Sequence, residues 1–256
     1  MLVEKKKYFN VFIEFDAELV DEIIQTTIVT KGKGYVCSVE SNNLTYANNH
    51  ADFMKVINGA LVNICDGSNL AWLLRKIHHK PFKPYIGADL FNKYVHMCRY
   101  RQYFLGNTRM VLDGLKTRLS QIDSEISKMI FDELPFLPVY EFDYHGIAAK
   151  INREKPDIIW VSLGAPKQEQ FMNLLLPHLE QGVMFGFGAI FNFYSGVGTV
   201  KRAPYWMRKI RLEWFYRACE EPKKNIPRYW NFVKIIPKLV CAEYKKRSNA
   251  YLSKTS

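Results

Sequence analysis

Asp66 is the residue of this sequence best placed for acid–base chemistry. It follows the apolar run "ALVNIC" and precedes Gly67, as a carboxylate at the end of a buried strand would. A carboxylate held there can take a proton from a hydroxyl group as a general base. An Asp close before a helix can also serve as its N-cap. The residue and its neighbours leave both roles open.

Two further apolar runs end in polar side chains. Ser38, Glu40 and Asn42 end one run in "YVCSVESN", and Lys167 and Gln168 follow another in "DIIWVSLGAPKQE". Polar residues of this kind are common in turns, where they hydrogen-bond to the nearby backbone. The start of a helix also favours anions, and the Gln168 amide could hydrogen-bond a sugar or a base. Because ligands of open α/β sheets bind at the carboxyl ends of the strands, the three strand ends predict a site.

Motifs that would assign a metal or a cofactor do not occur. The sequence has no P-loop, GxSxG or HExxH motif, and no DxD pair to hold a metal-bound nucleotide. The segment "GFGAIF" lacks the third Gly of a dinucleotide fingerprint, because Phe191 stands there. Five widely spaced cysteines without a CxxC pair indicate buried thiols, not a zinc site or disulfides. We therefore expect no metal and no cofactor.

The order of apolar and amphipathic segments predicts an α/β fold. Apolar runs of strand length alternate with stretches of helix length, as in a mostly parallel sheet with helices on both faces. Runs such as "IIWVSL" lack polar alternation, as strands buried on both faces should. Strands are expected at residues 8–14, 35–39, 61–65, 102–105, 137–141, 158–163 and 183–187. Helices are expected at residues 17–26, 48–58, 70–78, 89–99, 109–129, 145–151 and 167–175.

The excess positive charge lies in the C-terminal part of the chain. Residues 201–256 contain 15 Lys and Arg against 4 Asp and Glu, whereas residues 1–200 contain 21 of each kind. Strand-like runs also stop near 197–201, so we predict an α/β domain at 1–200 and a basic helical appendage at 201–256. Basic residues interleaved with aromatic ones favour lipid headgroups, nucleic acid or a nucleotide. The segment "NFVKIIPKLVCAEYKKR" is the predicted membrane contact.

Neither a signal peptide nor a membrane span is expected. The N-terminal apolar part carries acids and lacks a small-residue cleavage site. No window approaches 18 uninterrupted apolar residues. Together with the unpaired cysteines, these features predict a cytoplasmic protein.

Five segments occur in order between residues 35 and 228: "SVESN", "CDG", "LGAPKQE", "GFGAIFNFYSG…KRAPYW" and "LEWFYR…EEP". Together they resemble the WecG/TagA/CpsF family of glycosyltransferases. The resemblance implies a bacterial enzyme with a Rossmann-like fold that needs no DxD-bound metal. It implies transfer of N-acetylmannosamine, its uronic acid or a related hexose from a UDP-sugar. The acceptor would be a sugar on a polyprenyl diphosphate, such as undecaprenyl diphosphate, in surface polysaccharide synthesis.

The resemblance also implies roles for individual residues. Asp66 falls on the proposed base for the acceptor hydroxyl, with inversion at the anomeric carbon, and Ser38 falls on a Thr of the family and keeps its hydroxyl. Arg217, Lys224 and Arg228 are expected near the donor or lipid diphosphate. The remaining implied substrate-binding residues are Glu40, Asn42, Lys167, Gln168, Asn192 and Arg202.

Three segments depart from the family pattern. The residues "ESN", beginning at Glu40, stand where the family has Asn-Pro-Glu. Asn192 stands where the family has the Asp of "FDF", and Pro84 stands where it has an Arg, with Lys83 as the nearest basic residue. Because these positions border the predicted site, we expect a different donor sugar or acceptor.

The expected partners are a UDP-sugar, a polyprenyl-diphosphate-linked acceptor and an anionic membrane surface. No nucleic acid is expected, and a homo-oligomer is compatible with the sequence. The enzyme would be attached peripherally to the inner face of the plasma membrane. Its basic appendage would fold over the site, because without a metal the leaving diphosphate needs Arg or Lys.

Two other classes of protein stay open. A non-catalytic, basic nucleic-acid-binding protein would explain the appendage but would leave the three polar strand ends without a function. A nucleotide-dependent enzyme of another class, such as a dehydrogenase, would lack its dinucleotide fingerprint.

Overall fold

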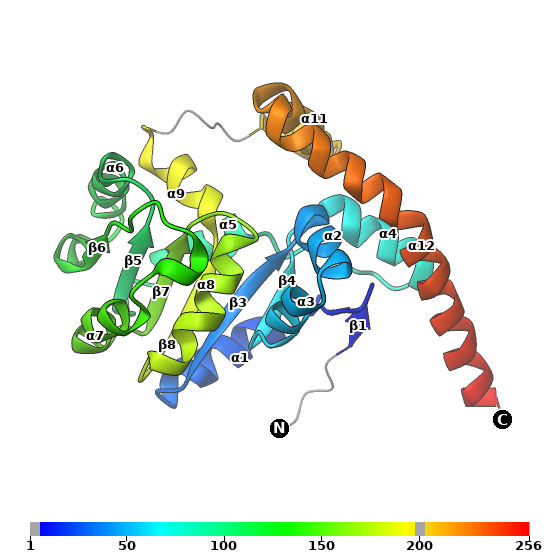
Figure 1. Cartoon of the computed structure of the whole chain (residues 1–256), viewed down its shortest axis with the longest axis horizontal. Coiled ribbons are helices and arrows are strands. Elements are labelled where there is room, and N and C mark those ends of the chain that lie inside the picture. Colours follow the sequence, from blue (N-terminus) through cyan, green and yellow to red (C-terminus); the bar gives the residue numbers. More distant parts are fainter. Residues whose placement is uncertain (1–5, 198–202, 256) are drawn as a thin grey trace.

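A computed structural model describes residues 6–197 and 203–255, with the surroundings of side chains described as far as residue 248. Within these residues, six strands form one sheet in the order β4-β3-β8-β7-β5-β6 (Figure 1). All neighbouring strands of this sheet are parallel. The strands are β3 (Lys33–Val39), β4 (Val62–Cys65), β5 (Gln102–Gly106), β6 (Ile130–Asp132), β7 (Ile158–Ser162) and β8 (Gly182–Gly186).

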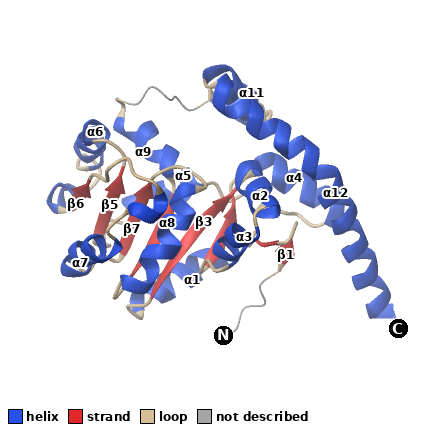
Figure 2. Ribbon diagram, viewed as in Figure 1, coloured by secondary structure: helices blue, strands red, loops and turns tan. Residues whose placement is uncertain are grey.

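Helices cover both faces of the sheet (Figure 2). In β7, Ile159 and Val161 point into one core cluster, and Ile158 and Trp160 point into the other. The first cluster is closed by α2 (Ser41–Asn49), α3 (Ala51–Asn58), α4 (Ser68–His78), α7 (Tyr144–Glu154) and α8 (Lys167–Leu175). The second is closed by α1 (Ala17–Val29), α5 (Gly87–His96), α6 (Arg109–Leu119) and α9 (Gly188–Ser195). The predicted α/β, Rossmann-like architecture is confirmed.

Residues 8–14 do not form the single strand that was predicted. They lie in a short hairpin of β1 (Lys7–Tyr8) and β2 (Val11–Phe12). Phe9 and Asn10 form its two-residue turn, with φ angles of 50° and 69°. Positive φ at both central residues is the geometry of a tight hairpin turn.

The prediction for residues 109–141 is wrong in two places. The strand expected at 137–141 is a short 3₁₀ helix, Val139–Glu141, after Pro138, which has no N–H for a sheet ladder. The sixth strand is β6, and the helix expected at 109–129 ends ten residues earlier at Leu119. A 3₁₀ helix, Ser124–Lys128, begins after the Asp123 side chain accepts a hydrogen bond from the Glu125 N–H.

Two helical segments also differ from expectation. The helix expected at 48–58 is two helices, α2 and α3, because His50 has extended backbone angles between them. Residues of "GFGAIFNFYSG" form α9, a helix that the sequence pattern did not predict.

The C-terminal appendage is helical, as predicted. It contains α10 (Tyr205–Lys209), α11 (Glu213–Glu220) and the long α12 (Pro222–Thr255). α12 packs against α2 and α4 and buries Leu239 in the first core cluster (Figure 1). The predicted boundary at 197–201 falls mostly on residues 198–202, which lie outside the described residues, so the division into 1–200 and 201–256 stays a prediction.

Candidate active site

Ser38 and Asp66 meet at the carboxyl ends of adjacent strands. β3 and β4 pair in parallel with Ser38 opposite Ile64, which brings Asp66 beside Ser38. The Ser38 hydroxyl donates a hydrogen bond of 2.6 Å to Asp66 Oδ2. The N–H of Gly87, at the start of α5, donates to Asp66 Oδ1 at 3.0 Å. Three segments distant in sequence therefore hold one carboxylate.

Asp66 does not cap the helix that follows it. Gly67 occupies the N-cap position of α4, which has no side-chain cap. Burial raises the pKa of Asp66 above its ordinary value, whereas the hydrogen bonds from Ser38 and Gly87 and the charge of Arg217 lower it. A carboxyl group that is partly desolvated but hydrogen-bonded in its charged form is suited to accept a proton.

Gln168 is buried and joins two loops. Its Oε1 accepts from the N–H groups of Gly164 and Gly188, both at 3.1 Å. Its Nε2 donates to Gly186 O at 2.7 Å and to Glu169 Oε1 at 3.1 Å. These four bonds use the full hydrogen-bonding capacity of a Gln side chain. Gln168 thus fixes the loops that follow β7 and β8, and its contact with a substrate stays a prediction.

Glu40, Asn42 and Asn192 lie at the border of this region. Glu40 is the N-cap residue of α2, Asn42 lies in the first turn of that helix, and both are partly exposed. Asn192 is partly exposed on α9, the helix that follows β8. Their exposure leaves them accessible to a ligand, and their contacts with substrate stay predictions.

Lys167 lies between two aromatic rings. Its Nζ is 5.1 Å from the centre of the Phe136 ring and 5.0 Å from that of Phe142. Such cation–π contacts hold the ammonium group at a defined place beside the loop that follows β7.

Two cations of the appendage lie at the same end of the sheet. Arg217, on α11, lies over the ring of Phe193 at 5.7 Å, and its charge lowers the pKa of Asp66. Arg228, on α12, donates to Ala165 O, in the loop after β7, across 3.5 Å. The helices that carry both residues lie above the carboxyl ends of the strands (Figure 1).

The other two basic residues predicted for the site differ from these. Lys224 is exposed and pairs at 3.0 Å with Glu221, the residue just before its helix begins. Arg202 lies outside the described residues.

Two charged or polar groups near Arg217 were not predicted. Glu213 pairs with Arg217 at 3.1 Å, one helical turn apart. Tyr229 lies among charges: burial and the charges of Glu40 and Glu213 raise its phenol pKa, whereas those of Arg217 and Arg228 lower it. The i,i+4 spacing in "EWFYR" is a sequence signal for the Glu213–Arg217 pair. Tyr229 has no such signal, because its place depends on how α12 docks.

The segment predicted to contact the membrane packs part of its apolar side chains on the protein, and its contact with a membrane stays a prediction. Phe232, Ile235, Ile236 and Val240 pack against the first core cluster. Other large apolar side chains of the appendage are exposed, including Val233 and Tyr244 of the same segment; the full set is Tyr205, Trp206, Ile210, Trp214, Phe215, Ile226, Trp230, Val233 and Tyr244. We call this set the aromatic surface. Within the described chain, no helix is long and apolar enough to cross a bilayer.

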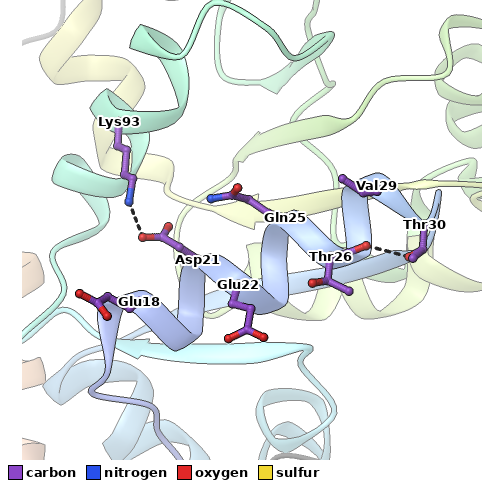
Figure 3. A pocket seen from close by; sticks show the side chains of 8 residues that line it. All are labelled: Glu18, Asp21, Glu22, Gln25, Thr26, Val29, Thr30 and Lys93. Carbon is purple, nitrogen blue, oxygen red and sulfur yellow. Dashed lines mark hydrogen bonds and ion pairs between the residues drawn. The ribbon is translucent and has the colours of Figure 1, made fainter. Parts of the chain in front are cut away.

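One surface hollow of the described residues lies away from the strand ends. It has a volume of about 570 Å³ and lies between α1 and α5, where Asp21 points toward Lys93 (Figure 3). Asp21 also accepts from the hydroxyls of Tyr85 and Tyr94. Its carboxylate is therefore satisfied within the fold. None of the predicted site residues lines this hollow.

The described residues include no group of three or more His, Cys, Asp or Glu that could hold a metal ion. All five cysteines are free thiols; Cys37 and Cys65 are buried, as predicted, whereas the prediction of burial is wrong for Cys98, Cys219 and Cys241, which are exposed.

The fold and the carboxylate at the carboxyl ends of its strands define an α/β enzyme of the open-sheet type. Residues 10–250 match the Glycosyl transferase WecG/TagA/CpsF family, and the chain belongs to this family of glycosyltransferases.

Curated relatives support the same class of enzyme. A protein of Bacillus subtilis (strain 168) is 27% identical over 201 residues, covering 77% of this chain and 74% of the relative. A protein of Staphylococcus aureus (strain MW2) is 26% identical over 193 residues, covering 74% and 73%. Both are named N-acetylglucosaminyldiphosphoundecaprenol N-acetyl-beta-D-mannosaminyltransferase.

Proposed function

We propose that this protein transfers N-acetylmannosamine, its uronic acid or a related hexose from a UDP-sugar to a sugar on a polyprenyl diphosphate. The observation that carries the proposal is the hydrogen-bonded pair of Ser38 and Asp66 within electrostatic reach of Arg217. The names of the relatives support an amino sugar as the donor group and a diphospho-undecaprenol sugar as the acceptor.

Asp66 acts as the general base in this proposal. It takes the proton of the acceptor hydroxyl while that oxygen bonds to the anomeric carbon and the bond to UDP breaks. Because UDP leaves from the opposite face, the configuration at the anomeric carbon inverts. The bonds from Ser38 and Gly87 orient the carboxylate and stabilise its charged form.

The appendage supplies the positive charge that the leaving diphosphate requires. Arg217 and Arg228 already lie at the carboxyl ends of the strands, and Lys224 is close to both in sequence. Cations aimed at developing negative charge lower the barrier without a metal. The reaction in this proposal therefore depends on the docked position of α11 and α12.

We place the enzyme on the cytoplasmic face of the plasma membrane, where a polyprenyl-linked acceptor would be embedded. The aromatic surface and the cations around it would rest on anionic headgroups. Exposed Trp and Tyr side chains favour the headgroup region, and each nearby Lys or Arg adds on the order of 1 kcal/mol.

A transfer assay with purified protein tests the proposal. UDP-N-acetylmannosamine, its uronic acid counterpart and other UDP-hexoses are each incubated with a synthetic N-acetylglucosaminyl polyprenyl diphosphate. The wild-type protein should form a disaccharide lipid of inverted configuration. Asp66→Asn should lower turnover by about 10²–10⁴-fold and still bind the donor, because a general base contributes about that much. Equal turnover by both proteins would remove Asp66 from the mechanism.

A further inference from the structure

Glu169 is a fully buried acidic residue that the mechanism above does not use. It lies in the first turn of α8 with 0% of its surface exposed. Its Oε1 accepts hydrogen bonds from Asn43 Nδ2 and from Gln168 Nε2, both at 3.1 Å. A buried carboxyl group without a cationic partner is costly in its charged form.

The two partners of Glu169 connect it to the candidate active site. Asn43 Nδ2 also donates to the backbone oxygen of Ser38 at 2.8 Å, and the Ser38 hydroxyl bonds Asp66. Gln168 holds the loops after β7 and β8 through three hydrogen bonds to their backbone, and its fourth hydrogen bond goes to Glu169. Glu169 Oε1 therefore connects two parts of the site. Through Asn43 it reaches the strand end that carries Ser38, and through Gln168 it reaches the loops after β7 and β8.

Two buried oxygens of this cluster are unpaired. Glu169 Oε2 and Asn43 Oδ1 have no hydrogen-bond partner among the described residues, although their side chains touch. Both atoms are acceptors when Glu169 is ionised, so neither can satisfy the other. A proton on Glu169 Oε2 would provide the missing donor, and the acid and amide groups would then pair through two hydrogen bonds. This pairing would remove two unsatisfied buried oxygens at once.

We propose that Glu169 is a positioning residue that works as a neutral carboxylic acid and, through Asn43 and Gln168, keeps Ser38 and the loops after β7 and β8 in register. Its effect on turnover rests on the proposed function, but its protonation state does not. Loss of the proton would leave a buried charge and loosen the contact between Asn43 and Glu169.

The charges around Glu169 agree with a neutral acid. The pKa of Glu169 is raised from 4.5 to about 7, with burial as the largest cause and the charge of Glu40, at the start of α2, acting in the same direction. The hydrogen bonds from Gln168 and Asn43 act in the opposite direction. Cys37, on β3, faces the same group, since a charge on Glu169 raises the already high pKa of that buried thiol.

Two variants of the full chain separate the functions of Glu169. Glu169→Gln keeps one acceptor oxygen and adds an N–H donor, so it imitates the neutral acid. Glu169→Leu keeps a similar volume and removes every hydrogen bond. Glu180→Gln is the matched control, because Glu180 is exposed and lies a few residues after the end of α8.

The first measurement needs no substrate. Carboxyl ¹³C NMR of Glu-labelled protein should show one group that titrates within about one unit of pH 7, absent from Glu169→Gln and present in Glu180→Gln. The thermal midpoint of the wild type should fall relative to that of Glu169→Gln between pH 6 and 8. If the resonance lost in Glu169→Gln titrates at an ordinary pH below about 5, the neutral acid is refuted.

The second measurement is turnover against pH. At pH 6.5, Glu169→Gln should transfer sugar at a rate within a few-fold of the wild type and should lose less activity as the pH rises to 8. Glu169→Leu should lower kcat by about 100-fold, more than it changes KM, because small displacements of catalytic groups cost about that much. A folded Glu169→Leu protein with wild-type kcat, or a Glu169→Gln protein as impaired as Glu169→Leu, would overturn the positioning role. If the wild type itself transfers no sugar, the proposed function fails, whereas the NMR titration still decides the protonation state.

Discussion

Replacing Ser38 with Ala gives a direct measure of whether Asp66 is the base. The Ser38 hydroxyl donates a 2.6 Å hydrogen bond to Asp66 Oδ2 and thereby lowers the pKa of that carboxyl group. In Ser38→Ala this stabilisation of the charged form is lost, while the bond from Gly87 and the charge of Arg217 remain. The pKa of Asp66 should therefore rise.

The size of this rise follows from the strength of the bond. A hydrogen bond to a charged group contributes about 1.5–3 kcal/mol, and one pKa unit corresponds to about 1.4 kcal/mol. The loss should raise the pKa of Asp66 by about 1–2 units. Because a base must be ionised to accept a proton, activity falls as the pH drops through this pKa. The acidic limb of kcat/KM should consequently move to higher pH by about 1–2 units.

The assay is the pH dependence of kcat/KM for sugar transfer between pH 4.5 and 9. Ser38→Thr is the matched control, since it keeps a hydroxyl at the same position and should leave the acidic limb in place. An acidic limb that stays in place or moves to lower pH in Ser38→Ala would refute the assignment of Asp66 as the base. A limb that moves equally in Ser38→Thr would mean that packing around β3, and not the hydrogen bond, sets the pKa.

Four further predictions concern the appendage and the loops. Arg217→Met and Arg228→Met should each lower kcat/KM by at least about tenfold, since a lost charge-assisted hydrogen bond costs about 1.5–3 kcal/mol, and the exposed Lys223→Met should not. Trp206→Ser combined with Trp230→Ser should weaken sedimentation with anionic vesicles, whereas Val29→Ser on α1 should not, because only the tryptophans belong to the aromatic surface. Glu243→Ala should lower the free energy of unfolding by about 1–3 kcal/mol in a denaturant titration. Glu243, on α12, accepts a hydrogen bond from the buried Phe9 N–H at 2.9 Å and lies 3.2 Å from His78. The control Glu243→Gln keeps an acceptor and should lose less stability. Gly188→Ala should cost about 1–3 kcal/mol in the same titration, because a Cβ there would lie 2.8 Å from Gln168 Oε1 and from Gly164 N.

The sequence predicts the strand ends of the site well and its hydrogen-bond network poorly. Ser38 and Asp66 could be placed together because each follows an apolar run, and parallel strands bring their carboxyl ends to one edge. The hydrogen bonds of Gln168 could not be predicted, because these partners are backbone groups of two loops that meet only in the fold.

Errors in the elements have local causes. Residues 137–141 have the composition of a strand, but Pro138 prevents a regular ladder, and the real strand β6 has only three residues. The apolar stripe of 231–247 was correctly seen as amphipathic. Amphipathicity alone cannot predict whether protein or lipid covers the apolar side chains. Here Leu239 and its apolar neighbours pack on α2, α4 and the first core cluster, whereas Val233 and Tyr244 are exposed.

In the proposed reaction, the pKa of Asp66 depends on the position of α11 in the appendage. Arg217 and Glu213 both belong to α11, and they act on Asp66 in opposite directions: Arg217 lowers its pKa and Glu213 raises it. The two residues are paired with each other at 3.1 Å, so part of each charge is compensated. A donor diphosphate that binds Arg217 would draw it away from Glu213 and weaken both their pair and the effect of Arg217 on Asp66. The negative charge of the diphosphate near Asp66 raises the pKa of that carboxyl group, which makes it a stronger base once it is ionised. Donor binding should therefore move the acidic limb of kcat to higher pH than that of kcat/KM, since kcat reports the bound complex and kcat/KM the free enzyme. Coincident limbs would mean that the diphosphate lies too far from Asp66 for Arg217 to serve both groups.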